Sequence, residues 1–198
     1  MTLMRIERLV EAAARTIVDH AAELTTLDQA IGDGDHGSNM RRGMEAVLAD
    51  LPNHSGKPPG ELLKAVGLQL VMKVGGASGP LYGTLTMELG KALPPDAGRA
   101  ELVGALDAAI AGVKARGKAE LGQKTLIDVL VPVRDAVAGG KAPDAVAIVA
   151  QTAAAATVPL RATRGRASFL GDRSIGHIDP GARSCALMVE AICAALEA

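Results

Sequence analysis

The sequence predicts an all-α protein in which eight helices form an antiparallel up-and-down barrel or bundle. Eight segments can be assigned as helices, and no stretch shows the alternation of apolar and polar residues that is typical of a β-strand. Of the 198 residues 48% are hydrophobic, yet the chain holds one Tyr, one Phe and no Trp. The apolar side chains are therefore mainly those of Ala, Leu, Val, Ile and Met, which favour closely packed helices. At this length we expect one domain over residues 1–198.

The first four helices are expected at residues 4–24, 38–51, 60–74 and 80–93. In the first, apolar residues follow helical spacing at Ile6, Leu9, Val10, Ala13 and Ile17. The second lies between Gly37 and Pro52, two residues that interrupt helices. Ser78 precedes the fourth and suits an N-cap, with Pro80 at an early helical position.

The other four helices are expected at residues 100–116, 124–138, 144–156 and from Pro180 nearly to the end. The fifth carries an apolar stripe made of Leu102, Leu106, Ile110 and Val113. The sixth contains Pro132, which cannot donate a helical hydrogen bond and should kink it. The seventh is rich in Ala, and Asp179 before Pro180 suits the cap of the eighth.

Alternate connections between these helices are longer and richer in Gly or charge than the others. They cover residues 25–37, 75–79, 117–123 and 160–179. In an up-and-down arrangement, the connections after helices one, three, five and seven emerge at the same end. We therefore expect a functional rim at that end of the barrel.

The first of these connections holds three aspartates, Asp28, Asp33 and Asp35, with glycines at positions 32, 34 and 37. Carboxylate oxygens are hard ligands that suit Mg²⁺ or Ca²⁺. The glycines permit a tight turn that brings the carboxylates together. This pattern indicates a divalent cation site, and the alternative is a solvated acidic loop whose aspartates cap the next helix.

Three better-known motifs do not fit this chain. Residues 32–37 match the dinucleotide fingerprint, but a helix precedes them where that fingerprint needs a strand. An EF-hand loop counted from Asp33 would have Met44 in place of the bidentate glutamate. No Walker P-loop occurs either, so a nucleotide would be bound without one.

Two further connections favour an anionic ligand. Residues 75–80 would present free N–H groups at the start of a helix, although an ordinary capped turn explains them equally well. The residues of the seventh connection and the start of the last helix include His177 and five arginines, Arg161, Arg164, Arg166, Arg173 and Arg183. Guanidinium groups bind phosphate in a bidentate manner.

Composition excludes several classes of partner. The net charge is −1 and the basic residues are interspersed with acidic ones, so we expect that the protein does not bind nucleic acid.

The two cysteines are expected to be reduced. Cys185 and Cys193 lie about 12 Å apart along one predicted helix, which is too far for a mutual disulfide. The sequence has no signal peptide and no long apolar span, so we expect a cytoplasmic protein without a membrane segment.

Taken together, these motifs resemble the nucleotide-binding L subunit (DhaL) of the dihydroxyacetone kinases. The resemblance covers essentially the whole chain and rests on residues 27–28, 31–37, 75–84, 116–120, 124–125, 165–171, 174–177 and 179–181. It implies an eight-helix antiparallel barrel with the nucleotide site at one rim.

The resemblance also implies the functional residues. Asp28, Asp33 and Asp35 would hold two Mg²⁺ ions that bridge the phosphates of ADP or ATP. The nucleotide would be surrounded by His36, Gly37, Ser38, Asn39, Ala77, Ser78, Gly117, Leu126, Arg166, Asp179, Pro180 and Gly181. Arg166 is the candidate catalytic residue, because a guanidinium can stabilise the transferring group.

The activity implied by the resemblance is phosphoryl transfer in two steps. Bound ADP would take a phosphoryl group from a phosphohistidine protein of the DhaM type. The resulting ATP would phosphorylate dihydroxyacetone held on a separate K subunit. The sequence holds no K domain, as in the type that depends on the phosphotransferase system, and a homodimer is left open.

Three other functions stay open from the sequence. The chain could be the L subunit of an ATP-dependent kinase for another short ketose, such as erythrulose. It could also be a non-catalytic, ADP-loaded module that binds a transcription regulator. The third alternative is a helical scaffold whose loops carry no function.

Overall fold

The computed structural model of the chain describes residues 3–197, with side chains from Ile6 onward. The first half contains α1 (Leu3–Asp19), α2 (Ala21–Ile31), α3 (His36–Asp50), the 3₁₀ helix η1 (Leu51–His54), α4 (Pro59–Lys73) and α5 (Ser78–Ala92). The second half contains α6 (Arg99–Gly117), α7 (Ile127–Ala138), α8 (Pro143–Ala155), the 3₁₀ helix η2 (Arg166–Ser174) and α9 (Pro180–Glu197). No strand occurs between residues 3 and 197.

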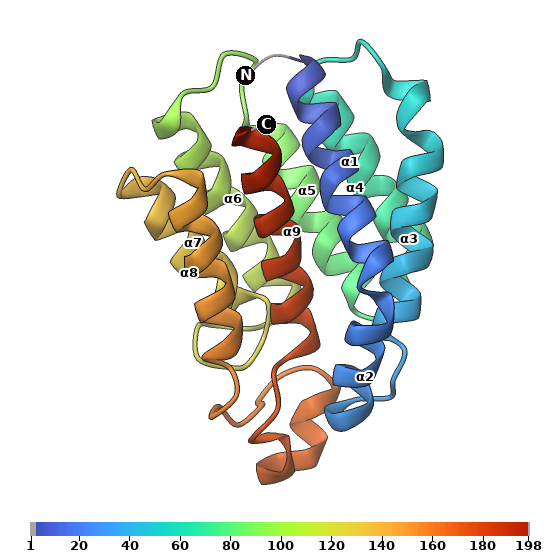
Figure 1. Cartoon of the computed structure of the whole chain (residues 1–198), viewed down its shortest axis with the longest axis vertical. Helices are drawn as coiled ribbons and strands as arrows, with labels where there is room; N and C mark the ends of the chain where they lie inside the picture. The colour runs from blue at the N-terminus through green and yellow to red at the C-terminus, as the bar shows by residue number, and fades with distance from the viewer. Residues whose placement is uncertain (1–2, 198) are drawn as a thin grey trace.

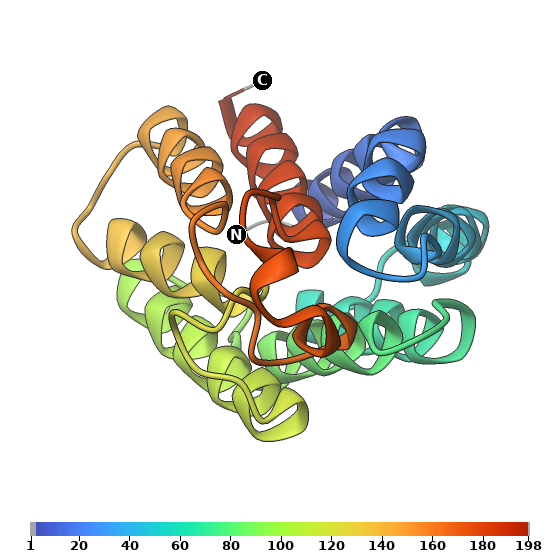
Figure 2. The ribbon, with the colours of Figure 1, turned by 90° about the horizontal axis from the view of Figure 1, so that it is seen from below.

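Eight of the helices form a closed ring. From α3 to α9, each helix packs against the next in chain order, and the ring closes where α1 lies between α3 and α9. The helices surround a common axis when the molecule is seen from below (Figure 2). Helix α2 continues beneath α1, where it packs against α3, α9 and η2 (Figure 1). The predicted all-α up-and-down barrel is confirmed.

The predicted boundaries needed three corrections. The first predicted helix is two helices, because a turn at His20 separates α1 from α2, so the count of eight is too low. Helix α2 continues to Ile31, so Asp28 is helical instead of part of a loop. Helix α7 begins at Ile127 because Lys124 has a left-handed φ of 63°, which a right-handed helix excludes.

Helices α4 and α5 approach so closely that their backbones touch. A Cβ atom added to Gly67 would lie 2.8 Å from the carbonyl oxygen of Gly83, and the reverse distance is also 2.8 Å. Near the other end, Cβ atoms on Gly60 and Gly90 would lie 2.4 and 2.6 Å from the opposite carbonyl oxygen. Only glycine fits at these positions, and the close packing fixes the turn at residues 74–77 that joins the two helices.

The inside of the ring is apolar. A cavity of about 410 Å³ lies in the half that contains the chain ends, lined by Leu, Val, Ile and Met side chains. Cys185 and Cys193 both line it as buried thiols, and they are free, as their spacing on one helix predicted. Tyr82 also lines it, and its hydroxyl group donates a hydrogen bond to the Gly181 carbonyl oxygen at 2.9 Å. No helix of the described residues is both long and apolar enough to cross a membrane.

The contact between α4 and α5 gives a stability test. In Gly67→Ala the new methyl group would collide with the backbone of α5, so we expect the free energy of unfolding to fall by about 1–3 kcal/mol. Gly104→Ala is the matched control, because a Cβ atom on this exposed glycine of α6 meets no atom within 4 Å. That substitution should stabilise the protein by up to about 1 kcal/mol. Chemical denaturation measures both, and equal effects would contradict the backbone contact.

Candidate active site

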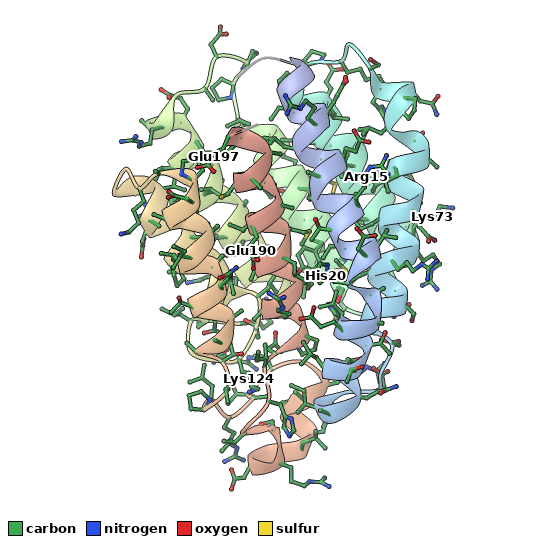
Figure 3. The ribbon with its side chains drawn as sticks, in the orientation of Figure 1. Arg15, His20, Lys73, Lys124, Glu190 and Glu197 are labelled. Atoms are coloured by element: carbon green, nitrogen blue, oxygen red, sulfur yellow. The ribbon has the colours of Figure 1, made fainter. Side chains whose placement is uncertain are left out.

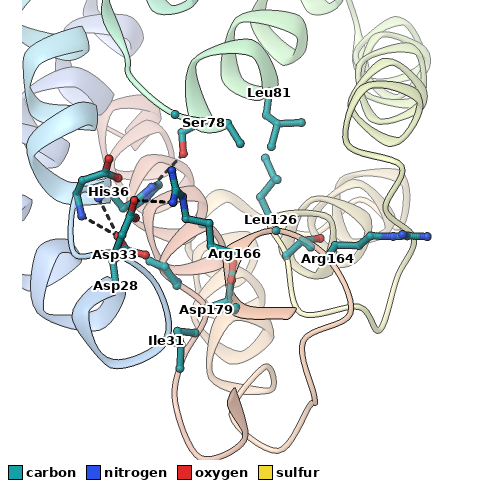
Figure 4. Close-up of a pocket in the computed structure, with 18 of the residues that line it drawn as sticks. Asp28, Ile31, Asp33, His36, Ser78, Leu81, Leu126, Arg164, Arg166 and Asp179 are labelled. Atoms are coloured by element: carbon teal, nitrogen blue, oxygen red, sulfur yellow. Dashed lines mark hydrogen bonds and ion pairs between the residues drawn. The ribbon is translucent and has the colours of Figure 1, made fainter. Parts of the chain in front are cut away.

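A pocket at the lower rim of the barrel gathers residues from four connections (Figure 4). Its walls come from the loops between α2 and α3, α4 and α5, α6 and α7, and α8 and α9. We call the last of these, residues 156–179, the arginine loop. The expected meeting of alternate connections at one rim is confirmed by this set of lining residues.

Three carboxylates form the acidic side of the pocket. One oxygen each from Asp28, Asp33 and Asp35 lies within 4.8 Å of the others. Asp28 is buried in the last turn of α2, and its Oδ2 accepts backbone hydrogen bonds from Asp35 (2.8 Å) and His36 (3.1 Å). These bonds fold the loop back over the carboxylate and draw Asp35 toward Asp28.

The glycines of this loop provide room and curvature. A Cβ atom on Gly32 would collide with Oδ1 of Asp28, at 2.1 Å. Gly34 has a φ of 76°, in the left-handed region that favours glycine. Asp35 occupies the N-cap position of α3, but its side chain makes no capping hydrogen bond. The Asp35 carboxylate is thus not used as a helix cap, which favours the cation site over the alternative of an acidic capping loop.

Arg166 faces these carboxylates from the arginine loop. Its Nη1 lies 3.0 Å from Oδ2 of Asp33, and the guanidinium group points toward the acidic side of the pocket (Figure 4). Arg164 points away from that side, and its Nε donates to Oε1 of Gln123 at 3.2 Å. The outer part of the loop is held on α2 by a small apolar cluster of Ile31, Ala162 and Ala167. Arg166 therefore places a positive charge beside Asp33.

His36 links three walls of the pocket through buried hydrogen bonds. Its Nδ1 lies 3.0 Å from Oγ of Ser78, and its Nε2 lies 2.9 Å from Oγ of Ser184 on α9. Ser184 Oγ is in turn 2.7 Å from the Tyr82 hydroxyl. Burial lowers the pKa of His36, although Asp28 and Asp35 act in the opposite direction. His36 thus joins the acidic loop to α5 and α9.

Asp179 caps helix α9 at the base of the pocket. Its Oδ2 accepts the Ala182 N–H at 2.7 Å, so the predicted cap is confirmed. Burial raises the pKa of Asp179 to about 7, against the opposing effects of this N–H and of the Lys124 ammonium group.

Ser78 was predicted as the N-cap of α5, and this prediction is wrong. Ala77 takes the N-cap position, and the Ser78 hydroxyl forms a hydrogen bond with His36 instead.

Most of the sequence-predicted site residues line this one pocket: Asp28, Asp33, Asp35, His36, Ala77, Ser78, Leu126, Arg166, Asp179, Pro180 and Gly181. Four others lie behind it. Gly37 and Asn39 are buried in the first turn of α3, where Asn39 Oδ1 accepts a hydrogen bond from Arg42. Ser38 is exposed and donates to the Asp35 carbonyl, and Gly117 stands behind Leu81 of the lining.

The sequence interpretation did not include several residues that form the pocket. Leu81, Tyr82 and Lys124 line it, and Ser184 on α9 contacts His36. Leu81, Tyr82 and Lys124 belong to short motifs on which the family resemblance rests, but they were not assigned to the site. Ser184 carried no signal, because it looks like an ordinary member of an apolar helix.

Comparison with known proteins identifies the class. Residues 30–194 match the model of the DAK2 domain family. The chain is 45% identical over 170 residues to "PEP-dependent dihydroxyacetone kinase 1, ADP-binding subunit DhaL" of Listeria innocua, covering 85% of this chain and 84% of that protein. The corresponding DhaL subunit of Escherichia coli K12 is 42% identical over 177 residues, covering 84% of each. The chain belongs to the DAK2 domain family.

Within that family the chain is of the DhaL type, the group of dihydroxyacetone kinase subunits, which are phosphotransferases. The fold agrees with the crystal structure of the dihydroxyacetone kinase from C. freundii in complex with AMP-PNP and Mg²⁺. The TM-score is 0.78 at 26% identity, and the match covers 98% of this chain and 34% of that one.

The shifted pKa of Asp179 gives a pH test. Since burial raises this pKa from 3.8 to about 7, the folded state holds the proton that the unfolded state releases. Stability is therefore highest below the unfolded pKa and falls as the pH rises toward 7, by up to about 1.4 kcal/mol per pH unit. Asp179→Asn lacks this loss, so its stability relative to the parent should increase between pH 4 and about 7.

Denaturant unfolding of the ligand-free protein at pH 5 and pH 8 measures this difference. Asp96→Asn, at an exposed position between α5 and α6, is the control and should show no such trend. A stability difference for Asp179→Asn that is the same at both pH values would contradict the raised pKa.

Proposed function

We propose that the chain is the ADP- and ATP-binding subunit of a dihydroxyacetone kinase that depends on phosphoenolpyruvate. The observation that carries this proposal is the cluster of Asp28, Asp33 and Asp35 opposite Arg166 in the rim pocket. Sequence identity with DhaL subunits, which are named as ADP-binding, supports it. We also propose that residues 1–198 act as one domain in this role.

The acidic cluster fits Mg²⁺. Its ligands are hard carboxylate oxygens close enough to share a cation, and two of the three groups are at least partly exposed to the pocket. The pairing of Asp33 with Arg166 supports the fit, because the carboxylates already attract a positive group. We propose that the three aspartates hold two Mg²⁺ ions. When bound, these ions would neutralise charge on the β- and γ-phosphates.

The other pocket residues would position the nucleotide. Ala77 and Ser78 lie at the start of α5 and Gly181 lies at the start of α9, so their backbone N–H groups and the two helix dipoles are available to an anion. Pro180 has no N–H group and would contact the nucleotide only through its ring. Leu81 and Leu126 give the same pocket an apolar part that suits a base or ribose. The remaining proposed nucleotide residues are His36, Arg166 and Asp179 in the lining, and Gly37, Ser38, Asn39 and Gly117 behind it.

The proposed reaction moves one phosphoryl group twice. In the first transfer a P–N bond of a phosphohistidine breaks and a P–O bond to the β-phosphate of ADP forms. In the second, the terminal P–O bond of ATP breaks as a hydroxyl oxygen of dihydroxyacetone is phosphorylated and loses its proton. Because the transition state of phosphoryl transfer is loose, catalysis depends mainly on positioning the reacting groups and on neutralising their charge. Arg166 suits the second task, since its guanidinium group already lies at the acidic side of the pocket.

Both transfers require partner proteins to reach the rim. The proposed partners are a phosphohistidine donor of the M type and a K subunit that holds dihydroxyacetone. Apolar side chains are exposed there, with Phe169 of the arginine loop 88% accessible and Leu121 of the loop between α6 and α7 54% accessible. These side chains support docking at the same end of the barrel as the pocket.

The metal cluster gives the first functional test. Asp33→Asn should weaken binding of ADP in the presence of Mg²⁺ by at least tenfold, because it removes one charge of the cation site. Calorimetric titration of ADP with and without Mg²⁺ measures this loss. Asp96→Asn, an exposed carboxylate at the opposite end of the barrel, should bind ADP like the parent. Unchanged affinity in Asp33→Asn would remove Asp33 from the proposed metal site.

Reconstitution tests the donor and the sugar. The chain carrying one bound ADP, mixed with K and M partners, should phosphorylate dihydroxyacetone with phosphoenolpyruvate as the energy source and without added ATP. The readout is consumption of phosphoenolpyruvate, with erythrulose as the competing substrate. A strict need for free ATP would instead indicate an ATP-dependent kinase. Failure of both sugars with every donor would reject the catalytic role.

A further inference from the structure

The two ends of the arginine loop meet at a narrow stem. The Gly176 N–H donates to the Val158 carbonyl oxygen at 2.9 Å. The Asp179 N–H donates to Oγ1 of Thr157 at 3.0 Å, and this hydroxyl is fully buried. The loop thus leaves the barrel at the end of α8 and returns to it at the start of α9 through neighbouring backbone positions.

Lys124 holds this stem from a third segment. Its ammonium group donates to the Thr157 carbonyl oxygen at 2.6 Å and to the His177 carbonyl oxygen at 2.5 Å. The side chain is 1% exposed, and it lies directly above the arginine loop (Figure 3). Because this buried lysine binds one carbonyl oxygen on each side of the stem, it joins the two ends of the loop.

The segment that carries Lys124 is itself fixed. Asp128, buried at the start of α7, accepts the Thr125 N–H at 2.7 Å and the Gly122 N–H at 2.5 Å. Lys124 lies between these two bonds with a left-handed φ of 63°. Burial lowers the pKa of Lys124, while Asp179 and Asp128 act in the opposite direction. The ammonium group is therefore aimed by the turn at residues 122–125.

The outer part of the loop is held less strongly than the stem. It contacts α2 through the small cluster around Ile31, and Arg166, whose side chain is 67% exposed, pairs with Asp33 in the loop after α2. The Thr163 N–H and Arg164 Nε also donate to Gln123, the residue before Lys124, at 3.4 and 3.2 Å. Exposed contacts of this kind contribute little to stability. The position of Arg166 therefore depends on the stem and on the segment around Lys124 as well as on the cluster at Ile31.

We propose that Lys124 is a positioning residue for the phosphoryl transfer, which clamps the stem of the arginine loop and so holds Arg166 over the pocket. This inference rests on the proposed function only for its role in the reaction. The clamp itself is a property of the ligand-free protein and can be measured without nucleotide.

A competing role for Lys124 is direct contact with a phosphate group, because it also lines the pocket. A second variant separates the two roles. Thr157→Val removes the hydroxyl that accepts the Asp179 N–H but leaves the Lys124 side chain in place. Thr157 does not line the pocket, so this variant loosens the stem without removing a charge from the site.

The experiment compares four variants by amide hydrogen exchange without nucleotide. Lys124→Met keeps a side chain of similar length, and it places a non-glycine residue at the same left-handed φ. It removes the two hydrogen bonds that the Lys124 ammonium group donates to the carbonyl oxygens of Thr157 and His177. In this variant and in Thr157→Val, we expect the amides of residues 160–176 to exchange at least tenfold faster, while α4 and α5 exchange as in the parent. Thr157→Ser restores the hydroxyl, and Lys64→Met makes the same change at an exposed lysine, so both should match the parent.

The release rate of ADP in the presence of Mg²⁺ is the second readout. It should rise in Lys124→Met and in Thr157→Val, and remain unchanged in Lys64→Met. Unchanged loop exchange in Lys124→Met would overturn the clamp. If that variant does not fold, unchanged loop exchange and unchanged ADP release in Thr157→Val would overturn the dependence of the loop on its stem. Faster release in Lys124→Met alone, with normal exchange, would also overturn it in favour of phosphate contact. If the parent protein does not bind ADP, the proposed function fails, while the exchange data still decide the clamp.

Discussion

The burial of one carboxylate organises the active rim. Asp28 sits in the last turn of α2, and its oxygen atoms would be costly to bury without partners. The N–H groups of Asp35 and His36 satisfy one of these oxygens and thereby bend the loop into the shape that collects two further carboxylates. The same bonds orient His36, which ties α5 and α9 to this loop. The acidic cluster and the barrel are therefore parts of one hydrogen-bonded unit.

Burial of polar groups recurs around the pocket in a consistent way. Asp128 holds the turn at residues 122–125, Asp179 caps α9, and Lys124 binds two carbonyl oxygens. In each case an ionisable side chain satisfies backbone groups at an irregular place in the chain, where no helix can do so. These buried groups thus fix the loops of the rim, whereas Arg166 remains exposed and pairs with Asp33.

The sequence was sufficient to predict the fold, and most of the predicted site residues line the rim pocket. Helical spacing, Gly and Pro positions and the order of the loops predicted the barrel, and the glycines at 32 and 34 predicted the meeting of the aspartates. The break at His20 could not be predicted, because the apolar pattern continues across it. The burial of Lys124 could not either, since its partners lie 33 and 53 residues away and are backbone carbonyls that every residue possesses. Ser184 was missed for the same reason, at 148 residues from His36.

Because α4 and α5 touch through glycines, the walls of the pocket differ in how firmly they are held. Backbones in direct contact cannot slide or separate without losing the whole interface, so these two helices and the turn at residues 74–77 behave as one stiff rod. The opposite wall is a long loop attached at a stem and a few outer contacts. When a ligand enters or leaves, the loop side should therefore move more readily than the rod.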